Sequence, residues 1–321
     1  MEPAFMGIDV SKKTFDVALL KGERPKSGKF KNTPDGFAMV VRWLQKEGAE
    51  DTHVCMEATG TYGEKLAEHL YETGHVVSVV NPAKIKGFAQ SELSRTKTDK
   101  ADAALIARFC RAMRPAPWQP TSPEVKELQS LVRRLGSLTD MLNRETNRLG
   151  ITDGIARESV ERTVDHLKNE IESTKRLIRS HIDQHTNLKD KRDLLESIPG
   201  IGPATSAMIL AELGDVARFQ NARRMASFCG LTPRHRQSGS SVRGKTMLSK
   251  TGASGIRKAL YMPAIVAMSC NPLVSGFCLR LRQYGKCTMV IIGAAMRKLL
   301  HIIYGVLKNG RPFDPAIGAT A

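Results

Sequence analysis

Four acidic residues in the first third of the chain are spaced like carboxylates that share a metal site. Asp9 lies at the end of the first predicted strand, and Glu57 ends the strand that we expect beside it. Asp99 and Asp102 are three residues apart, so on a helix they lie on one face. Clustered carboxylates repel one another unless cations lie between them, and all-oxygen ligands suit Mg²⁺ or Mn²⁺. Two such ions about 4 Å apart would stabilise the attacking and leaving oxygens of a phosphoryl transfer.

A Gly-x-Gly turn at Gly200 and Gly202 lies between two predicted helices. In a helix-hairpin-helix, such a turn directs the backbone N–H groups of a helix N-terminus at a phosphate oxygen, without reading sequence. The alternative is a tight turn that only packs two helices, because glycine is also the usual helix stop.

A Gly- and Ser-rich segment with basic neighbours follows, and it offers the hydroxyls of Ser238, Ser240 and Ser241. Small residues let the backbone approach a phosphate, and Arg and Lys neutralise it. By chemistry alone we expect a phosphate-gripping loop, because a serine hydroxyl needs a base or a metal before it can act as a nucleophile. The basic residues that we expect to contact nucleic acid are Arg234, Arg236, Arg243, Lys245, Lys250, Arg257 and Lys258.

The elements that must position the four acids follow the order βββαβαβα. The predicted strands cover residues 5–10, 14–20, 29–31, 53–57 and 76–80. Helices are predicted from Thr33-Pro34, around residues 62–71, and between residues 82 and 113. The first three strands form an antiparallel meander, and the later ones are parallel because a helix lies between them. This is the order of an α/β ribonuclease H-like fold, which we place at residues 1–118.

Each acid alone has a simpler interpretation. A strand-end Asp is often a turn or helix cap, and Asp99 and Asp102 fit the solvated start of a helix. A metal site is favoured by the set, because all four fall where a ribonuclease H-like sheet builds its metal site.

Residues 119–190 change character and predict a long α-helical coiled coil. Apolar residues recur at steps of three and four, first at Leu128, Leu131, Leu135, Leu138 and Leu142 and then in a similar rhythm from Val160 to Ile178. The stretch from Gly150 to Gly154 would reverse the chain between two helices. The seam either pairs with another subunit or packs as a hairpin on its own domain, because a heptad pattern does not identify its partner.

Positive charge is concentrated in the last domain, which we place at residues 191–321 and expect to be mainly α-helical. The chain has 321 residues and a formal charge of +17, and residues 201–321 carry 17 Lys and Arg against 3 acidic residues. Ordinary solvated surfaces mix both signs, so a polyanion partner is favoured. Aromatic residues make up only 5% of the chain, so base stacking is not the obvious binding mode.

Composition favours a folded, soluble, cytoplasmic protein, with 41% hydrophobic and 25% charged residues. We find no apolar run near the roughly 18 residues that span a bilayer and no basic-then-apolar start, and we expect no membrane partner. The cysteines form no CxxC pair, so we expect reduced core thiols at Cys55, Cys110, Cys229, Cys270, Cys278 and Cys287.

Five motifs, taken together, resemble the DEDD transposases of bacterial insertion sequences and the related Piv-type DNA invertases. The resemblance covers essentially the whole chain. The motifs are Gly7-Ile8-Asp9, Met56-Glu57-Ala58-Thr59-Gly60, Lys97-Thr98-Asp99-x-x-Asp102, Ile198-Pro199-Gly200-Ile201-Gly202, and Gly230-Leu231-Thr232-Pro233 with Gln237-Ser238-Gly239.

The resemblance implies a RuvC-like catalytic domain, a coiled coil and a C-terminal transposase domain. By position, Asp9, Glu57, Asp99 and Asp102 would hold Mg²⁺, and Ser238 would attack the phosphodiester to form a covalent link to DNA. The implied partners are target and donor DNA, a structured guide RNA (bridge RNA) encoded beside the gene, and further copies of the chain in a dimer or tetramer. The implied location is the cytoplasm of a bacterium, at the nucleoid.

Three other classes of protein fit parts of the pattern. A hydrolytic RuvC-like junction nuclease would use metal-activated water in place of Ser238. An actin-like ATPase or sugar kinase also has Gly-Ile-Asp on its first strand, but we find no second phosphate-binding hairpin. A non-catalytic architectural DNA-binding protein would explain the basic domain and leave the four acids without a purpose.

Overall fold

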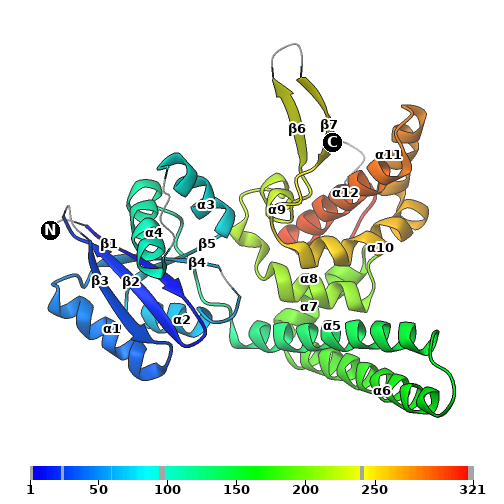
Figure 1. Ribbon diagram of the computed structural model, residues 1–321. Coiled ribbons are helices and arrows are strands. Elements are labelled where there is room, and N and C mark those ends of the chain that lie inside the picture. The colour runs from blue at the N-terminus through cyan, green and yellow to red at the C-terminus, as the bar shows by residue number, and fades with distance from the viewer. Residues whose placement is uncertain (1–2, 23–24, 59, 94–97, 239–241, 317–321) are drawn as a thin grey trace. The chain divides into compact units, whose positions relative to one another are not determined.

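The computed structural model describes residues 3–22, 25–58, 60–93, 98–238 and 242–316, and for 235–238 and 242–246 it describes the backbone alone. Ser240 and Ser241, and Lys97 of the third motif, therefore lie outside the described residues. The chain divides into two compact units, Met1–Pro120 and Thr121–Ala321. Figure 1 shows the elements of each unit.

The N-terminal unit contains a five-stranded sheet in the order β3-β2-β1-β4-β5. Its strands are β1 (Ala4–Val10), β2 (Thr14–Leu20), β3 (Lys26–Lys31), β4 (Thr52–Glu57) and β5 (Val76–Val80). β1, β2 and β3 are antiparallel neighbours, whereas β4 runs parallel to both β1 and β5. The predicted meander and the predicted parallel strands are therefore confirmed, and the mixed sheet is compatible with a ribonuclease H-like fold.

Helices cover both faces of this sheet, because the strands alternate apolar residues between two cores. The four helices are α1 (Pro34–Lys46), α2 (Glu64–Glu72), α3 (Pro82–Ser91) and α4 (Asp99–Met113). Met6 and Ile8 of β1 pack in one core with residues of α1 and α2, while Phe5 packs in the other core with residues of α3 and α4.

The C-terminal unit begins with two long helices, α5 (Pro123–Leu149) and α6 (Ile155–Gln184), joined by a short turn. Leu138 of α5 packs with Leu167 and Ile171 of α6 near the middle of the pair. At one end, residues such as Leu128 and Ile182 join the main apolar core of the unit. The pair is thus built into the C-terminal unit through one of its ends.

The rest of this unit is mainly helical. Its elements are α7 (Thr186–Glu196), α8 (Pro203–Leu213), η1 (Val216–Arg218), α9 (Ala222–Phe228), β6 (Pro233–Ser238), β7 (Val242–Leu248), α10 (Ser254–Cys270), α11 (Pro272–Gln283) and α12 (Thr288–Asn309). We expected a phosphate-gripping loop in the segment that contains Ser238, but β6 and β7 form an antiparallel ribbon. Its sequence has polar and basic residues where strands usually alternate apolar ones, so periodicity could not reveal it.

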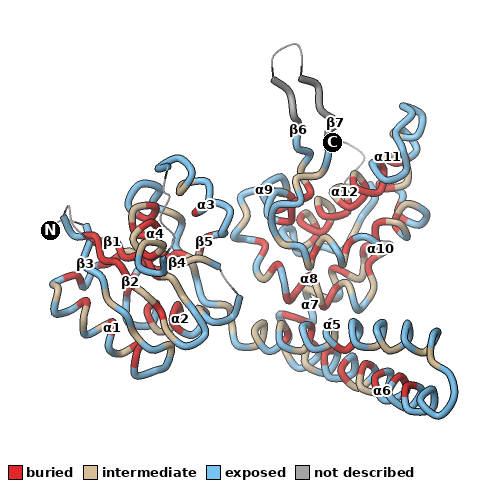
Figure 2. The backbone as a smooth tube through the Cα atoms, in the orientation of Figure 1, coloured by how far each residue is buried: buried red, intermediate tan, exposed pale blue. Residues whose placement is uncertain are grey.

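α12 corrects the expectation that no segment is long and apolar enough to span a bilayer. Its 22 residues pass that test of length and hydropathy, although 56% of the apolar window is buried inside the protein. Figure 2 shows buried positions along α12, and its residues are part of the main core of the C-terminal unit. The burial is that of a core helix. The six cysteines are free, but Cys270 and Cys287 are exposed and so are not core thiols.

Candidate active site

The ends of two parallel strands place the first two acids next to each other. β1 and β4 pair with Gly7 opposite Cys55 and Ile8 opposite Met56. Continuing this register brings Asp9 beside Glu57, which is the last residue of β4. Both side chains are half-buried at the same edge of the sheet.

A close approach of α4 to β1 brings the other two acids to the same edge. A Cβ atom on Gly7 would lie 2.2 Å from the carbonyl oxygen of Ala103 and 2.2 Å from the backbone nitrogen of Ala107. Only glycine allows this contact, because any side chain would displace the helix backbone. α4 begins at Asp99, with the hydroxyl of Thr98 accepting a hydrogen bond from Ala101 N, so Asp99 and Asp102 occupy its first turn.

The electrostatics of Asp9 show that the four acids influence one another. Burial, followed by the negative charges of Asp102, Asp99 and Glu57 in decreasing order, raises the pKa of Asp9 from 3.8 to about 6. Like charges destabilise an ionised carboxylate, so the folded site favours a proton or a cation at this position. The sequence identified these four residues one by one, and the structure brings their charges together.

A fifth carboxylate, Asp16, was not identified from the sequence. It lies on β2 directly opposite Asp9, and its charge adds to the upward shift of the pKa of Asp9. Asp16 also forms an ion pair with Lys29 on β3, at 3.1 Å between Oδ2 and Nζ. Its position as the polar residue of an alternating strand gave no sign of this role; the cross-strand register supplies it.

The donor set of this site suits a hard divalent cation, because all four groups are carboxylates with excess negative charge. Among the residues that the structure describes, no three Asp, Glu, His or Cys side chains are placed to hold one ion. The carboxylates are therefore close enough to raise the pKa of Asp9, but they must converge further to coordinate a metal.

The Gly200 and Gly202 turn connects α7 to α8, as the sequence predicts, and its two glycines face different surroundings. Gly200 packs against Ala267 of α10, and Asn271 donates a hydrogen bond to Pro199 O at 3.3 Å. Gly202 caps the N-terminus of α8, and the space where its Cβ would lie is open. Gly202 is thus the part of the turn that a phosphate can approach.

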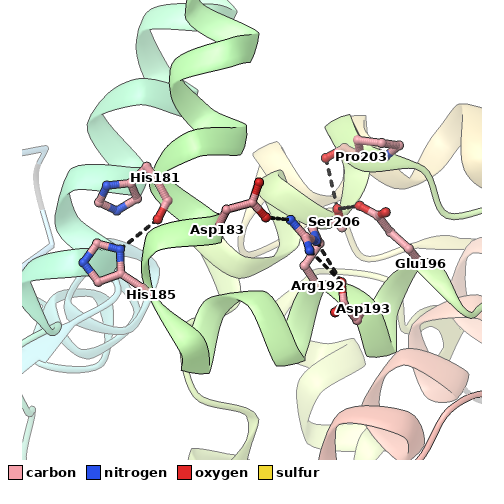
Figure 3. Close-up of polar contacts among 8 residues, drawn as sticks. All are labelled: His181, Asp183, His185, Arg192, Asp193, Glu196, Pro203 and Ser206. Atoms are coloured by element: carbon pink, nitrogen blue, oxygen red, sulfur yellow. Dashed lines mark hydrogen bonds and ion pairs between the residues drawn. The ribbon is translucent and has the colours of Figure 1, made fainter.

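A set of polar contacts, of which only Ser206 is fully buried, joins the helices on either side of this turn. The Ser206 hydroxyl donates to Glu196 Oε1 at 2.7 Å, joining α8 to the end of α7. Arg192 of α7 pairs with Asp183 and Asp193, which holds α7 against the end of α6 (Figure 3). The Ser206–Glu196 bond thus joins α8 to α7, and the Arg192–Asp183 pair joins α7 to the end of α6.

Ser238 is the last residue of β6 and pairs with Val242 of β7. We call the ribbon of β6 and β7 the serine arm; it extends from the helices of the C-terminal unit (Figure 1). The base of the arm is tightly built, because a Cβ on Gly252 would lie 2.0 Å from Phe228 O. Arg257 also donates hydrogen bonds there, to Cys229 O at 3.0 Å and Gly252 O at 3.3 Å.

The basic residues predicted to contact nucleic acid differ in whether their side chains are exposed to solvent or engaged within the protein. Arg234, Lys250 and Lys258 are exposed, and Lys258 lies 3.6 Å from Asp140. The guanidinium of Arg257 is engaged by backbone carbonyls at the base of the arm. The side chains of Arg236, Arg243 and Lys245 lie outside the described residues.

Comparison with known proteins gives consistent matches over both units. A family model for DEDD transposases of the IS110 type matches residues 6–151, and one described as the transposase IS116/IS110/IS902 family matches residues 192–278. The pilin gene-inverting proteins of Moraxella bovis and Moraxella lacunata are each 36% identical over 320 residues, covering 99% of this chain and 99% of each relative. The transposase for insertion sequence element IS1328 of Yersinia enterocolitica is 26% identical, covering 78% of this chain and 82% of its own.

Proposed function

This chain belongs to the IS110 family of DEDD transposases and recombinases, and from that membership we propose that it cuts and rejoins DNA through a covalent link to Ser238. The observation that carries the proposal is the placement of four carboxylates at one edge of the sheet: Asp9 beside Glu57, with Asp99 and Asp102 in the first turn of α4. Repulsion among four acids lowers the stability of the folded protein, so their presence together favours a cation-dependent reaction.

Asp9, Glu57, Asp99 and Asp102 would hold Mg²⁺ or Mn²⁺, as two ions. When bound, these ions would supply positive charge to the phosphate oxygens of the scissile bond. The N-terminal unit would then be a RuvC-like, ribonuclease H-like catalytic domain over residues 1–118. The close contact between Gly7 and α4 would hold Asp99 and Asp102 at the sheet edge where Asp9 and Glu57 lie.

The covalent step exchanges one phosphoester bond for another. Ser238 Oγ attacks the phosphorus, the bond from phosphorus to one deoxyribose oxygen breaks, and the hydroxyl proton of Ser238 passes to a base while the leaving oxygen gains a proton. A hydroxyl of the second strand then attacks the phosphoserine and releases Ser238. The phosphoester energy is conserved, so strand exchange needs neither ATP nor water.

Ser238 and the four acids belong to different units, so we propose a composite active site that forms when the units dock. The long helices α5 and α6, within residues 119–190, would form a coiled coil that joins copies of the chain into a dimer or tetramer. In that assembly one subunit would bring its serine arm to the carboxylates of another, and cutting would depend on oligomerisation.

The C-terminal domain, residues 191–321, would hold the nucleic acids. No acidic residue occurs between Asp215 and Asp314, which favours binding of target and donor DNA and of a structured bridge RNA. The Gly202 turn would act as a helix-hairpin-helix that contacts a phosphate, together with the exposed Arg234, Lys250 and Lys258. The protein would grip backbones while RNA pairing reads the sequence, at the nucleoid in the cytoplasm.

The two pilin gene-inverting relatives favour one form of this activity. They match this chain from end to end at 36% identity. By analogy with what their names state, we propose that the chain recombines two sites and can invert the segment between them. The order in which strands are rejoined would distinguish inversion from insertion in a plasmid carrying two sites.

The test is a denaturing gel for protein linked to DNA. Purified protein is mixed with Mg²⁺, end-labelled junction and target DNA, and RNA transcribed from the flanks of the gene. We expect a covalent band that disappears with Ser238→Ala, with Asp99→Ala, or when the metal or RNA is left out. Asp99→Ala should change the affinity for nucleic acid by less than about twofold relative to the wild type. The reason is that Asp99 belongs to the N-terminal unit, whereas the basic residues proposed to bind nucleic acid belong to the C-terminal unit.

The other outcomes identify the rival functions. Cleavage without a covalent band would indicate a hydrolytic junction nuclease and leave Ser238 to grip phosphate. DNA that stays intact with Mg²⁺ would indicate an architectural DNA-binding protein. If Asp99→Ala weakened binding as much as cleavage, the metal site would be wrong.

A further inference from the structure

Lysines gather at the same end of the sheet as the four acids, on the side of the antiparallel strands. Residues 10–15 and 25–34 contain five lysines and no acidic residue. Two of these lysines lie in the turn between β1 and β2, and two lie toward the end of β3, the edge strand of the sheet (Figure 1). All four are exposed, and the functions proposed above do not use them. We call them the lysine edge: Lys12, Lys13, Lys29 and Lys31.

A row of paired residues connects Lys29 to the carboxylates. In the register of the antiparallel strands, Asp16 lies directly opposite Asp9, and Lys29 lies directly opposite Asp16. Residues directly opposite each other share a face of the sheet, with Cβ atoms about 5 Å apart. The row lies on the face that α4 covers, because Gly7, two residues before Asp9, is in contact with α4. Lys29 is therefore two strands away from Asp9 on the same face.

An ion pair holds the Lys29 ammonium group in this row and leaves it exposed. Lys29 Nζ lies 3.1 Å from Asp16 Oδ2, and the Lys29 side chain is 56% exposed, whereas that of Asp16 is 15% exposed. An ammonium group has three N–H donors, so a single carboxylate leaves donors that can bind a phosphate. Exposed ion pairs contribute little to stability, so Lys29 can also turn toward a new anion with little loss.

Asn32 connects the lysine edge to the loop that follows β4. Its Nδ2 atom donates to Ser11 O at 3.0 Å and to Tyr62 O at 3.1 Å, and its backbone N–H donates to Lys13 O at 2.9 Å. The end of β3, the β1–β2 turn and the loop after Glu57 are thus joined at this end of the sheet. Tyr62 is 50% exposed. An exposed aromatic residue near exposed lysines is the combination that binds a nucleic-acid strand, by stacking on a base and neutralising the backbone.

The charges of the N-terminal unit are separated rather than mixed. Residues 1–100 carry 15 basic and 14 acidic residues, so the net charge of this part is close to zero. The four acids would contact a phosphate through metal ions, whereas the lysine edge would contact phosphates directly. A nucleic-acid strand fits both surfaces, because its phosphates repeat along the chain. A small anion would fit only one of them.

We propose that the lysine edge and Tyr62 bind the DNA strand on one side of the phosphate that is cut. The strand would run from the carboxylates across β1 and β2 to Lys29 and Lys31, with Lys12 and Lys13 on the turn beside it. An unpaired base would stack on Tyr62. The proposal rests on the function proposed above, because that function places the scissile phosphate in DNA. The N-terminal unit would then share in holding the DNA with the basic C-terminal unit.

The test compares two double variants of the full chain that remove the same charge. Lys29→Gln combined with Lys31→Gln changes the lysine edge. Lys26→Gln combined with Lys46→Gln is the matched control. Lys26 also lies on β3 and forms an ion pair, with Glu47, but its register partner is near the opposite end of β2. Lys46 is exposed in the last turn of α1.

Fluorescence anisotropy measures the affinity for labelled junction DNA with Mg²⁺ at several salt concentrations. All variants also carry Ser238→Ala, so that binding is read without the covalent step. We expect the lysine-edge variant to bind about tenfold more weakly at about 0.15 M salt, and the slope of log affinity against log salt to fall by about 1.5, for two lost phosphate contacts. The control should stay within about twofold of the parent protein. Affinity for RNA transcribed from the flanks of the gene should change by less than about twofold in both.

Two substitutions at Tyr62 test the stacking. Tyr62→Ala removes the ring and should weaken binding of DNA with an unpaired base about tenfold. Tyr62→Phe keeps the ring and should bind like the parent protein. Equal binding by the two variants would overturn the assignment of a base to Tyr62.

Several results would overturn the lysine edge as a DNA surface. An equal loss in the two double variants would mean that net charge alone sets the affinity. A loss confined to RNA would assign the surface to the guide, and a weaker oligomer with unchanged DNA affinity would assign it to another copy of the chain. Anisotropy measures binding and not cutting, so the two proposals stay apart: the expected loss of affinity, in a protein whose Ser238 form gives no covalent band, would remove the serine mechanism and retain the lysine edge.

Discussion

The four carboxylates and the serine arm differ in the secondary structure that supports them. Asp9 and Glu57 lie at the ends of β1 and β4, and Asp99 and Asp102 lie in the first turn of α4. The sheet that carries them is covered by helices on both faces. Ser238 ends a ribbon of only two strands, and a two-stranded ribbon alone is at best marginally stable in water. Groups that repel one another need a stiff support. The nucleophile that we propose would reach its phosphate from this ribbon, whose root is fixed by the close contact of Gly252 with Phe228 O.

The largest expected effect is on the support of the carboxylates. Gly7→Ala should destabilise the N-terminal unit by about 3 kcal/mol or more, because the new Cβ would meet two backbone atoms of α4 at 2.2 Å. Urea unfolding of the full chain measures this effect. Gly87→Ala, in an exposed turn of α3 with open space around its Cβ, is the control and should be neutral or slightly stabilising. A similar small effect from both would mean that α4 does not hold the acids rigidly.

The base of the serine arm gives the next effect. Gly252→Ala should destabilise the C-terminal unit by about 2–3 kcal/mol, because φ is +125° and the new Cβ would lie 2.0 Å from Phe228 O. The covalent band should fall sharply, whereas Mg²⁺ binding by the other unit, followed by calorimetry, should not change. Gly276→Ala in α11, which has open space, is the matched control. A normal covalent band in a folded Gly252→Ala protein would show that the arm needs no fixed base.

The difference between the packed sheet and the two-stranded ribbon also explains which parts of the fold could be predicted from the sequence. The strand arrangement was predictable, because alternating apolar residues leave a local pattern. Strand-end carboxylates leave one too, and the metal site that they suggest stays a prediction. The serine arm was not predictable, since a polar, basic ribbon without a core behind it has no apolar period. The role of Asp16 depends on the register of β1 and β2, and that of Gly7 depends on contacts with Ala103 and Ala107, which lie far along the chain. No local pattern records such contacts.

The third prediction concerns the repulsion at Asp9, in protein without metal. Because the folded-state pKa is raised from 3.8 to about 6, ionised Asp9 destabilises the folded protein above pH 6, and the loss is relieved as the pH falls toward 3.8. The full shift corresponds to about 3 kcal/mol, which solvent screening of a half-buried group reduces to about 1–2 kcal/mol. Asp9→Asn should therefore raise stability by that amount at pH 8 and by nearly nothing at pH 4, while it abolishes the covalent band.

Asp16→Asn is the matched control for this prediction, because it removes a charge directly across the strand from Asp9. Asp16 is the weakest of the charges that raise the pKa of Asp9, and its removal breaks an ion pair with the exposed Lys29. The two changes oppose each other, so stability at pH 8 should change by less than about 1 kcal/mol. Titration of Asp9 by NMR should show a slightly lower pKa. If Asp16→Asn stabilised the protein as much as Asp9→Asn, the repulsion would come from the whole sheet edge, and the acids in the first turn of α4 would have no particular effect on Asp9.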